Sequence, residues 1–103
     1  MGGPGGDYAN PELLFAAGYA ACFHSALKFV ARAADVDVTD SEVSATVDIG
    51  PLESGAFGLA VELDVSLPNT DAEQAQAVVE RAHEVCPYSN ATRGNVDVKL
   101  RIV

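Results

Sequence analysis

The amino-acid sequence predicts a single α+β domain with the element order helix, strand, strand, helix, strand. Residues 10–34 and 71–86 repeat apolar side chains every three or four positions, which is typical of helices. Residues 42–49, 57–67 and 96–102 alternate apolar and polar side chains, which is typical of strands with one buried face. A chain of 103 residues is enough for one such domain, spanning residues 1–103.

The first helix carries clear start signals. Residues 1–9 are rich in glycine and predict a flexible loop. Asn10 can cap free backbone N–H groups, Pro11 suits the first helical position, and Glu12 complements the helix dipole. From Leu13 to Ala31 the helix is apolar on nearly every side, so we expect it to lie in a core. The remaining elements cannot easily cover it, which predicts either a partner subunit or a missing part of the chain.

Turn signals separate the later elements. Glycine, proline and serine in residues 50–55 predict a hairpin between the first two strands. Thr70 or Asp71 is the expected cap of the second helix, and Pro87 ends that helix. Residues 87–94 are polar and are predicted to form a loop before the last strand.

Charge and targeting signals exclude several classes of function. The chain has 6 lysines and arginines against 15 aspartates and glutamates, a formal net charge of −9. Nucleic acids and anionic membranes attract basic proteins instead. There is no uninterrupted apolar run of about 18 residues and no signal peptide at Met1. We therefore expect a cytoplasmic protein that binds neither nucleic acid nor membrane.

The two cysteines are the candidate reactive residues. Cys22 lies in the apolar first helix and Cys86 ends the second, and two packed antiparallel helices could bring them together. The helix C-terminus disfavours a Cys86 thiolate, which suits a second, resolving thiol. Burial alone raises the pKa of Cys22. Neither Lys28 nor Arg32 shares its turn, so a cation would have to come from elsewhere, for example Arg93. The alternative is that both are small buried hydrophobes.

Two other sites have weak support. Cys22, His24, His83 and Cys86 raise the possibility of a zinc site. Cys22 and His24 point in different directions on a helix, however, and only His83 and Cys86 share a face. Ser89 has no arrangement with histidine and aspartate that sequence spacing supports. We expect no bound metal.

Two long stretches resemble the OsmC/Ohr family. Residues 10–23, Asn-Pro-Glu-Leu-Leu-Phe-Ala-Ala-Gly-Tyr-Ala-Ala-Cys-Phe, resemble its first cysteine motif. Residues 82–95, Ala-His-Glu-Val-Cys-Pro-Tyr-Ser-Asn-Ala-Thr-Arg-Gly-Asn, resemble the second, in the form typical of the Ohr branch, the organic hydroperoxide resistance proteins. Gly2 to Gly6 resemble the glycine-rich loop before the family's first helix.

The resemblance implies the OsmC-like fold and a thiol peroxidase active in the oxidative stress response. Cys22 matches the peroxidatic cysteine, which attacks an organic (alkyl or fatty-acid) hydroperoxide, releases the alcohol and becomes a sulfenic acid. Cys86 matches the resolving cysteine, which would form a Cys22–Cys86 disulfide. A dithiol, such as a lipoyl group or a lipoylated protein, would reduce that disulfide, and no cofactor is needed.

Glu12 matches the family's active-site glutamate, which hydrogen-bonds to an arginine beside the peroxidatic thiolate. In a continuous helix Glu12 and Cys22 lie about 15 Å apart along the axis. Either the helix bends after Glu12, or Glu12 reaches the cysteine of the partner subunit. The resemblance implies an intertwined homodimer with sites at the interface, which favours the second. Glu12 could otherwise only complement the helix N-terminus.

The family's N-terminal strands precede the glycine-rich loop and carry that arginine. No residue of this chain matches it, so we expect an OsmC/Ohr-like domain that lacks the N-terminal strands and a Cys22 whose pKa stays high. The alternative function is a catalytically weak OsmC-like fragment that only dimerises or binds apolar ligands.

Overall fold

The computed structural model describes residues 10–103, which form three helices and one three-stranded sheet. The helices are α1 (Pro11–Ala34), α2 (Ala72–Val85) and α3 (Pro87–Thr92). The strands are β1 (Glu42–Pro51), β2 (Phe57–Ser66) and β3 (Asp97–Ile102). The α+β class predicted from the sequence is confirmed. The predicted flexible loop of residues 1–9 lies outside the described residues, and the extent of the domain remains a prediction.

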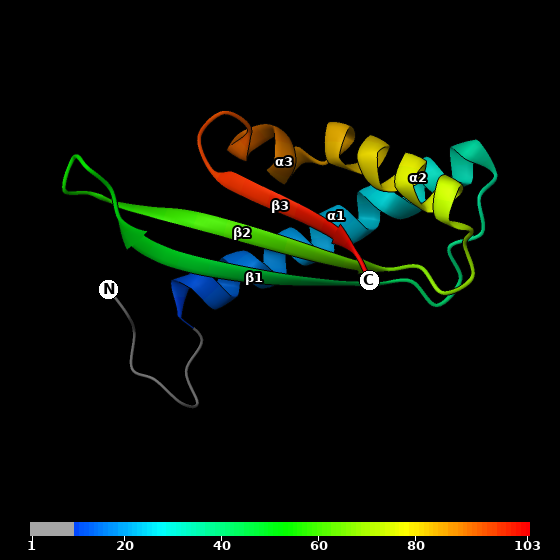
Figure 1. The fold of residues 1–103 in the computed structure, drawn as a ribbon, viewed down its shortest axis with the longest axis horizontal. Coiled ribbons are helices and arrows are strands. Elements are labelled where there is room, and N and C mark those ends of the chain that lie inside the picture. The colour runs from blue at the N-terminus through cyan, green and yellow to red at the C-terminus, as the bar shows by residue number, and fades with distance from the viewer. Residues whose placement is uncertain (1–9) are drawn as a thin grey trace.

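The sheet has the strand order β1-β2-β3. β1 and β2 form the predicted antiparallel hairpin, in which Val47 is opposite Val61. β3 returns in parallel beside β2, with Val98 opposite Val61. The chain reaches β3 through α2 and α3, while α1 lies behind the sheet in Figure 1. Helix α1 packs against both β1 and α2.

The core fills the space between α1, the inner face of the sheet and α2. Tyr19, Phe23 and Leu27 of α1 are fully buried, as are Leu63 and Val65 of β2. Helix α2 contributes the four buried residues of its inner stripe, Ala75, Val78, Val79 and Ala82. The helical stripes and the strand alternation expected from the sequence therefore meet in one core.

Both helix starts follow the predicted caps. The side chain of Asn10 accepts a hydrogen bond from the backbone N–H of Leu13 at 2.8 Å. Asp71 caps α2 in the same way, because its carboxylate accepts from the backbone N–H of Gln74 at 2.8 Å. Thr70, the other candidate, bonds to a backbone carbonyl outside the helix. Each cap satisfies a donor that the helix leaves free.

Helix α1 is not buried on every side in the single chain. Leu13, Leu14 and Phe29 are 58%, 63% and 67% exposed. The remaining elements of one chain therefore leave part of this apolar helix uncovered, as the sequence predicts, because the sheet and α2 each pack along a single stripe of it. The homodimer that would cover the remaining face stays a prediction.

Helix α1 is also long and apolar enough, by length and composition alone, to cross a membrane. Polar residues interrupt the apolar run in the sequence, so the sequence analysis did not indicate this. Core helices of soluble proteins pass the same test. The complete burial of Phe23 and Leu27 in the core fits that case.

Residues 87–94 contain a short helix where the sequence predicts a loop. Pro87 ends α2 and also occupies the first position of α3, where its missing N–H and fixed φ are favourable. The backbone N–H of Asn90 and its side-chain amide donate to the carbonyl of Cys86, at 3.0 and 3.1 Å. Local side-chain bonds thus stabilise a helix that is too short for a 3.6-residue pattern to indicate.

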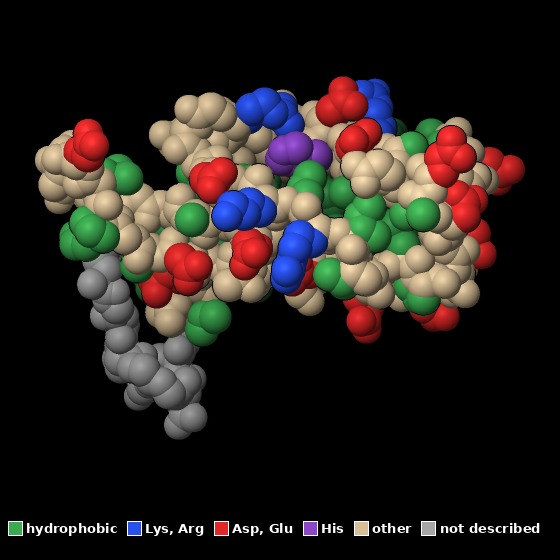
Figure 2. Space-filling model, in the orientation of Figure 1, with side chains coloured by type: hydrophobic (Ala, Val, Ile, Leu, Met, Phe, Trp, Pro, Cys, Tyr) green, Lys and Arg blue, Asp and Glu red, His purple; other side chains and the backbone are tan. Residues whose placement is uncertain are grey.

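The outward face of the sheet is charged. Figure 2 shows acidic and basic side chains interleaved over this face. Arg101 and Asp64, which are opposite each other on β3 and β2, form one forked pair at 2.8 and 3.1 Å. The sheet therefore buries only its inner face, and the chemistry must be sought around α1.

Candidate active site

The two cysteines meet where α1 passes the junction of α2 and α3. The Sγ atoms of Cys22 and Cys86 lie 3.7 Å apart, and both thiols are free. Cys22 lies near the middle of α1, and Cys86 is the single residue between α2 and α3. The approach of two helices that the sequence predicts is confirmed. A disulfide bond is about 2.05 Å long, so a small movement can join the two sulfurs.

The two thiols differ in their access to solvent. Cys22 is partly exposed, whereas Cys86 is fully buried. A reagent from solution therefore meets Cys22 first. From the sequence, the C-terminus of α2 is expected to disfavour a Cys86 thiolate. That argument is incomplete, because Cys86 is also the N-cap of α3, and the dipole of α3 acts in the opposite direction. Burial, and not the helix dipole, distinguishes the two thiols.

The pKa of the Cys22 thiol lies above its usual value. Burial raises it most, a hydrogen bond from the backbone N–H of Tyr88 lowers it, and the neighbouring Cys86 raises it again. The Tyr88 donor was not identified from the sequence. Its signal was present, because Tyr88 is the second residue of α3 and the first N–H groups of a helix have no partner within it.

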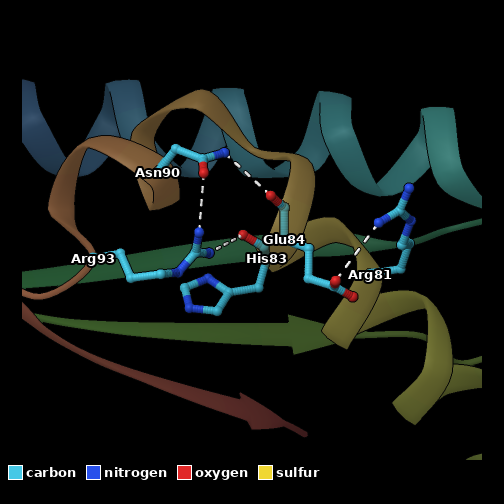
Figure 3. Close-up of polar contacts among 5 residues, drawn as sticks. All are labelled: Arg81, His83, Glu84, Asn90 and Arg93. Carbon is cyan, nitrogen blue, oxygen red and sulfur yellow. Dashed lines mark hydrogen bonds and ion pairs between the residues drawn. The ribbon is translucent and has the colours of Figure 1, made fainter.

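Arg93, the candidate cation for Cys22, has other partners. Its guanidinium donates to the backbone carbonyl of His83 at 2.7 Å and to the side-chain oxygen of Asn90 at 3.0 Å. Asn90 in turn donates to the backbone carbonyl of Glu84 at 3.1 Å, as Figure 3 shows. Within residues 10–103 no lysine or arginine contributes to the pKa shift of Cys22. The hydrogen bonds of Arg93 therefore hold α2 and α3 together.

A second set of hydrogen bonds lies on the inner side of α3. The hydroxyl of Ser89, which is fully buried, lies 2.7 Å from the Tyr19 hydroxyl and 2.8 Å from Nδ1 of His83. Burial and the nearby Arg93 lower the pKa of His83, which favours a neutral ring. Sequence spacing did not indicate the pairing of Ser89 with His83. Ser89 is fully buried between Tyr19 and His83, which is typical of a structural hydroxyl.

Glu12 lies away from the cysteines of its own chain. Helix α1 is continuous from Pro11 to Ala34, which keeps Glu12 and Cys22 about 15 Å apart along the axis. The predicted alternative in which the helix bends is therefore wrong. Within the described residues, Oε1 of Glu12 is buried without a hydrogen-bond partner. It borders an apolar cavity of about 300 Å³ that is lined by Pro11, Phe15, Ile49, Phe57 and Leu59.

The histidines have partners other than a metal. Nε2 of His24 lies 2.8 Å from the hydroxyl of Ser41, on the sheet side of α1. His83 bonds to Ser89, as described above. In the part of the chain that the structure describes, no three His, Cys, Asp or Glu side chains gather in a way that could hold a metal ion. Nothing in these contacts favours the zinc alternative.

The fold and the cysteine pair agree with one protein class. A family model described as OsmC-like protein matches residues 3–101, and the chain belongs to this family, in its Ohr branch. An organic hydroperoxide resistance protein of Xanthomonas axonopodis pv. citri (strain 306) is 54% identical over 104 aligned positions, which cover 99% of this chain and 72% of that protein. The organic hydroperoxide resistance protein OhrB of Bacillus subtilis (strain 168) is 53% identical over 94 positions, covering 90% and 68%.

Solved structures confirm the predicted OsmC-like fold. An organic hydroperoxide resistance protein from Elizabethkingia anophelis, crystallised with thiocyanate bound, superposes with a TM-score of 0.92 at 55% sequence identity. The superposition covers 98% of this chain and 72% of that one.

Proposed function

We propose that this chain acts in resistance to organic hydroperoxides as a thiol peroxidase that reduces them to alcohols. The observation that carries the proposal is the 3.7 Å approach between a partly exposed and a fully buried thiol. The names of the relatives from Xanthomonas and Bacillus support the substrate class. The net charge of −9 favours a protein without a nucleic-acid partner.

Oxidation begins at Cys22. Its thiolate attacks the distal oxygen of the hydroperoxide, the O–O bond breaks, and the alkoxide leaves as the alcohol after taking up a proton. The sulfur is oxidised to a sulfenic acid. The Tyr88 backbone N–H, which lowers the Cys22 pKa, is the group in the described chain that supports the thiolate.

Cys86 then resolves the oxidised sulfur. Its sulfur attacks Cys22 Sγ, the S–O bond breaks, and water leaves with the thiol proton as the disulfide forms. A dithiol of the lipoyl type reduces this disulfide by thiol–disulfide exchange and is itself oxidised to a cyclic disulfide. Complete burial of Cys86 keeps it reduced until Cys22 reacts, because the hydroperoxide reaches only the exposed thiol.

The surroundings of the cysteines favour an apolar substrate. The rings of Phe15, Tyr19 and Tyr88 form a cluster with centroids 5.7 to 5.9 Å apart. The Tyr88 backbone contacts Cys22 directly, so the cluster adjoins the reactive sulfur. Burial of apolar area stabilises an alkyl or fatty-acid hydroperoxide there but offers nothing to hydrogen peroxide.

Glu12 acts at the partner subunit's Cys22 in this proposal. Among residues 10–103 its buried Oε1 has no hydrogen-bond partner, and a donor from a second subunit would offset the cost of burying a carboxylate oxygen. The exposed face of α1, with Leu13 and Leu14, is where the second subunit of a homodimer would pack.

One observation favours a weaker second candidate, a chain that dimerises or binds apolar ligands with little catalysis. The raised pKa of Cys22 leaves a smaller fraction of reactive thiolate at neutral pH. The two candidates differ in turnover, because only the peroxidase consumes hydroperoxide repeatedly.

The test is consumption of cumene hydroperoxide by the purified chain with dihydrolipoamide as reductant. We expect turnover by the unsubstituted protein and none by Cys22→Ser. Cys86→Ser should consume about one equivalent rapidly and accumulate a dimedone-reactive sulfenic acid at Cys22.

Ser41→Ala is the matched control, since Ser41 pairs with His24 away from both sulfurs. Equal turnover by the unsubstituted protein and Cys22→Ser contradicts the peroxidase. Binding of the hydroperoxide without any consumption supports the second candidate instead.

A further inference from the structure

We propose that Tyr19, Ser89 and His83 are positioning residues that hold the first turn of α3 on α1, so that the Tyr88 N–H and the Cys86 sulfur both reach Cys22. The proposal deepens the proposed function, since it concerns the same pair of cysteines. Its central measurements use thiol chemistry without hydroperoxide, so it can fail or succeed independently of peroxidase activity.

The three residues join the three helices that build the site. Tyr19 lies on α1, Ser89 on α3 and His83 on α2, and the Ser89 hydroxyl bonds to the other two at 2.7 and 2.8 Å. Each member stands three positions from a cysteine, which is about one helical turn within α1. The network therefore fixes the junction close to both sulfurs.

The network gives the junction a geometric precision that apolar packing would not. Tyr19 and Ser89 are fully buried, and a buried pair of hydroxyls stabilises little more than apolar side chains of the same shape would. Hydrogen bonds are directional, however, whereas apolar contacts tolerate sliding of one helix along another. Short bonds at a buried point thus set where α3 sits along α1.

Gly18 shows how close the two helices are. A Cβ atom at Gly18 would lie 3.1 Å from the Tyr88 hydroxyl oxygen and 3.3 Å from Cε2 of its ring. The ring of Tyr88 thus rests on α1 one turn before Cys22, while its backbone N–H bonds to the Cys22 sulfur. A small shift of α3 would remove this hydrogen bond and separate the sulfurs.

The hydrogen bonds of Arg93 and Asn90 do not hold α3 on α1, so this role falls to Tyr19, Ser89 and His83. Arg93 and Asn90 bind carbonyls of His83, Glu84 and Cys86, which tie α3 to α2. None of these bonds reaches α1. The described hydrogen bonds that tie α3 to α1 through side chains run from Tyr19 to Ser89 and, at 3.4 Å, to Thr92.

The test compares Tyr19→Phe and Ser89→Ala with the unsubstituted protein. The first measurement is the pH profile of Cys22 alkylation by iodoacetamide in the reduced protein carrying Cys86→Ser. We expect both variants to shift the profile to higher pH, because the Tyr88 hydrogen bond that lowers the Cys22 pKa is weakened. A role confined to stability would leave this profile in place.

The second measurement is the rate of Cys22–Cys86 disulfide formation with diamide, a thiol oxidant, in proteins that retain both cysteines. We expect a slowing of about tenfold or more, because a misplacement near 1 Å is costly to reactions between positioned groups. His83→Gln should restore most of the rate relative to His83→Leu, since an amide can still bond to the Ser89 hydroxyl.

Ser41→Ala is again the matched control, because it removes a histidine–serine bond of the same 2.8 Å length on the opposite side of α1. It should leave both measurements unchanged. Unchanged profiles and rates in folded Tyr19→Phe overturn the proposal, and so does an equal effect of Ser41→Ala. Should Ser89→Ala fail to fold, Tyr19→Phe, which removes one oxygen atom, decides the outcome.

Discussion

A double-mutant cycle between Tyr19→Phe and Ser89→Ala measures how strongly the inner network couples the helices. Removing the Ser89 hydroxyl leaves two groups without their partner. The buried Tyr19 hydroxyl keeps only Thr92 at 3.4 Å, which is longer than a normal O–H···O bond, and His83 loses its bond at Nδ1. At about 1–2 kcal/mol for each orphaned group, Ser89→Ala should cost roughly 2–4 kcal/mol of unfolding free energy.

Tyr19→Phe should cost less, about 1 kcal/mol, because Ser89 keeps its bond to His83. In that background Ser89→Ala orphans only the histidine. The two changes should therefore couple by about 1 kcal/mol or more. The free energies are measured by urea unfolding, and the dependence of the unfolding free energy on urea concentration should be the same in all variants. Protein concentration is held fixed, because self-association makes stability depend on it. Additivity within about 0.3 kcal/mol refutes the reasoning.

Three further predictions test the core and the titrating groups. Leu27→Ala should lower the free energy of unfolding by about 2–5 kcal/mol in urea, because Leu27 is fully buried. His24 and His83 have pKa values lowered chiefly by burial, so the unfolded chain binds more protons below pH of about 6.5. The free energy of unfolding should therefore fall as the pH is lowered through this range, and it should fall less steeply in His24→Gln. The same dependence on pH in His24→Gln and in the unsubstituted protein would contradict this. The alkylation rate of Cys22 should still be increasing at pH 9.0, the ordinary thiol value, and a plateau near neutral pH would contradict the raised pKa.

Much of the fold followed from local patterns. Asn10 and Asp71 capped their helices as expected, and the apolar alternation of β1 and β2 placed both strands and their hairpin. The short helix α3 was missed because six residues hold less than two turns, and its stabilising bonds come from side chains such as Asn90. Hydrogen bonds of this kind produce no periodic pattern of apolar residues in the sequence.

The site was predictable in part. The two motifs made Cys22 and Cys86 the candidate reactive residues, and their approach, expected from the packing of two helices, is confirmed. The Tyr88 N–H donor, the Ser89 bonds and the true partners of Arg93 depend on where α3 sits, which spacing along the chain does not define.

By itself, the sequence determined the α+β class, the starts of α1 and α2, the acidic charge and the two motifs that place the chain in its family. These properties are local, since capping, periodicity and motif spacing act within a few residues. The tertiary structure alone decided the 3.7 Å separation of the sulfurs and the burial that leaves Cys22 partly exposed and Cys86 hidden. Each of these depends on the packing of elements far apart in the chain. Two sulfurs approach, and burial changes the pKa of a thiol, only once the fold has formed around them.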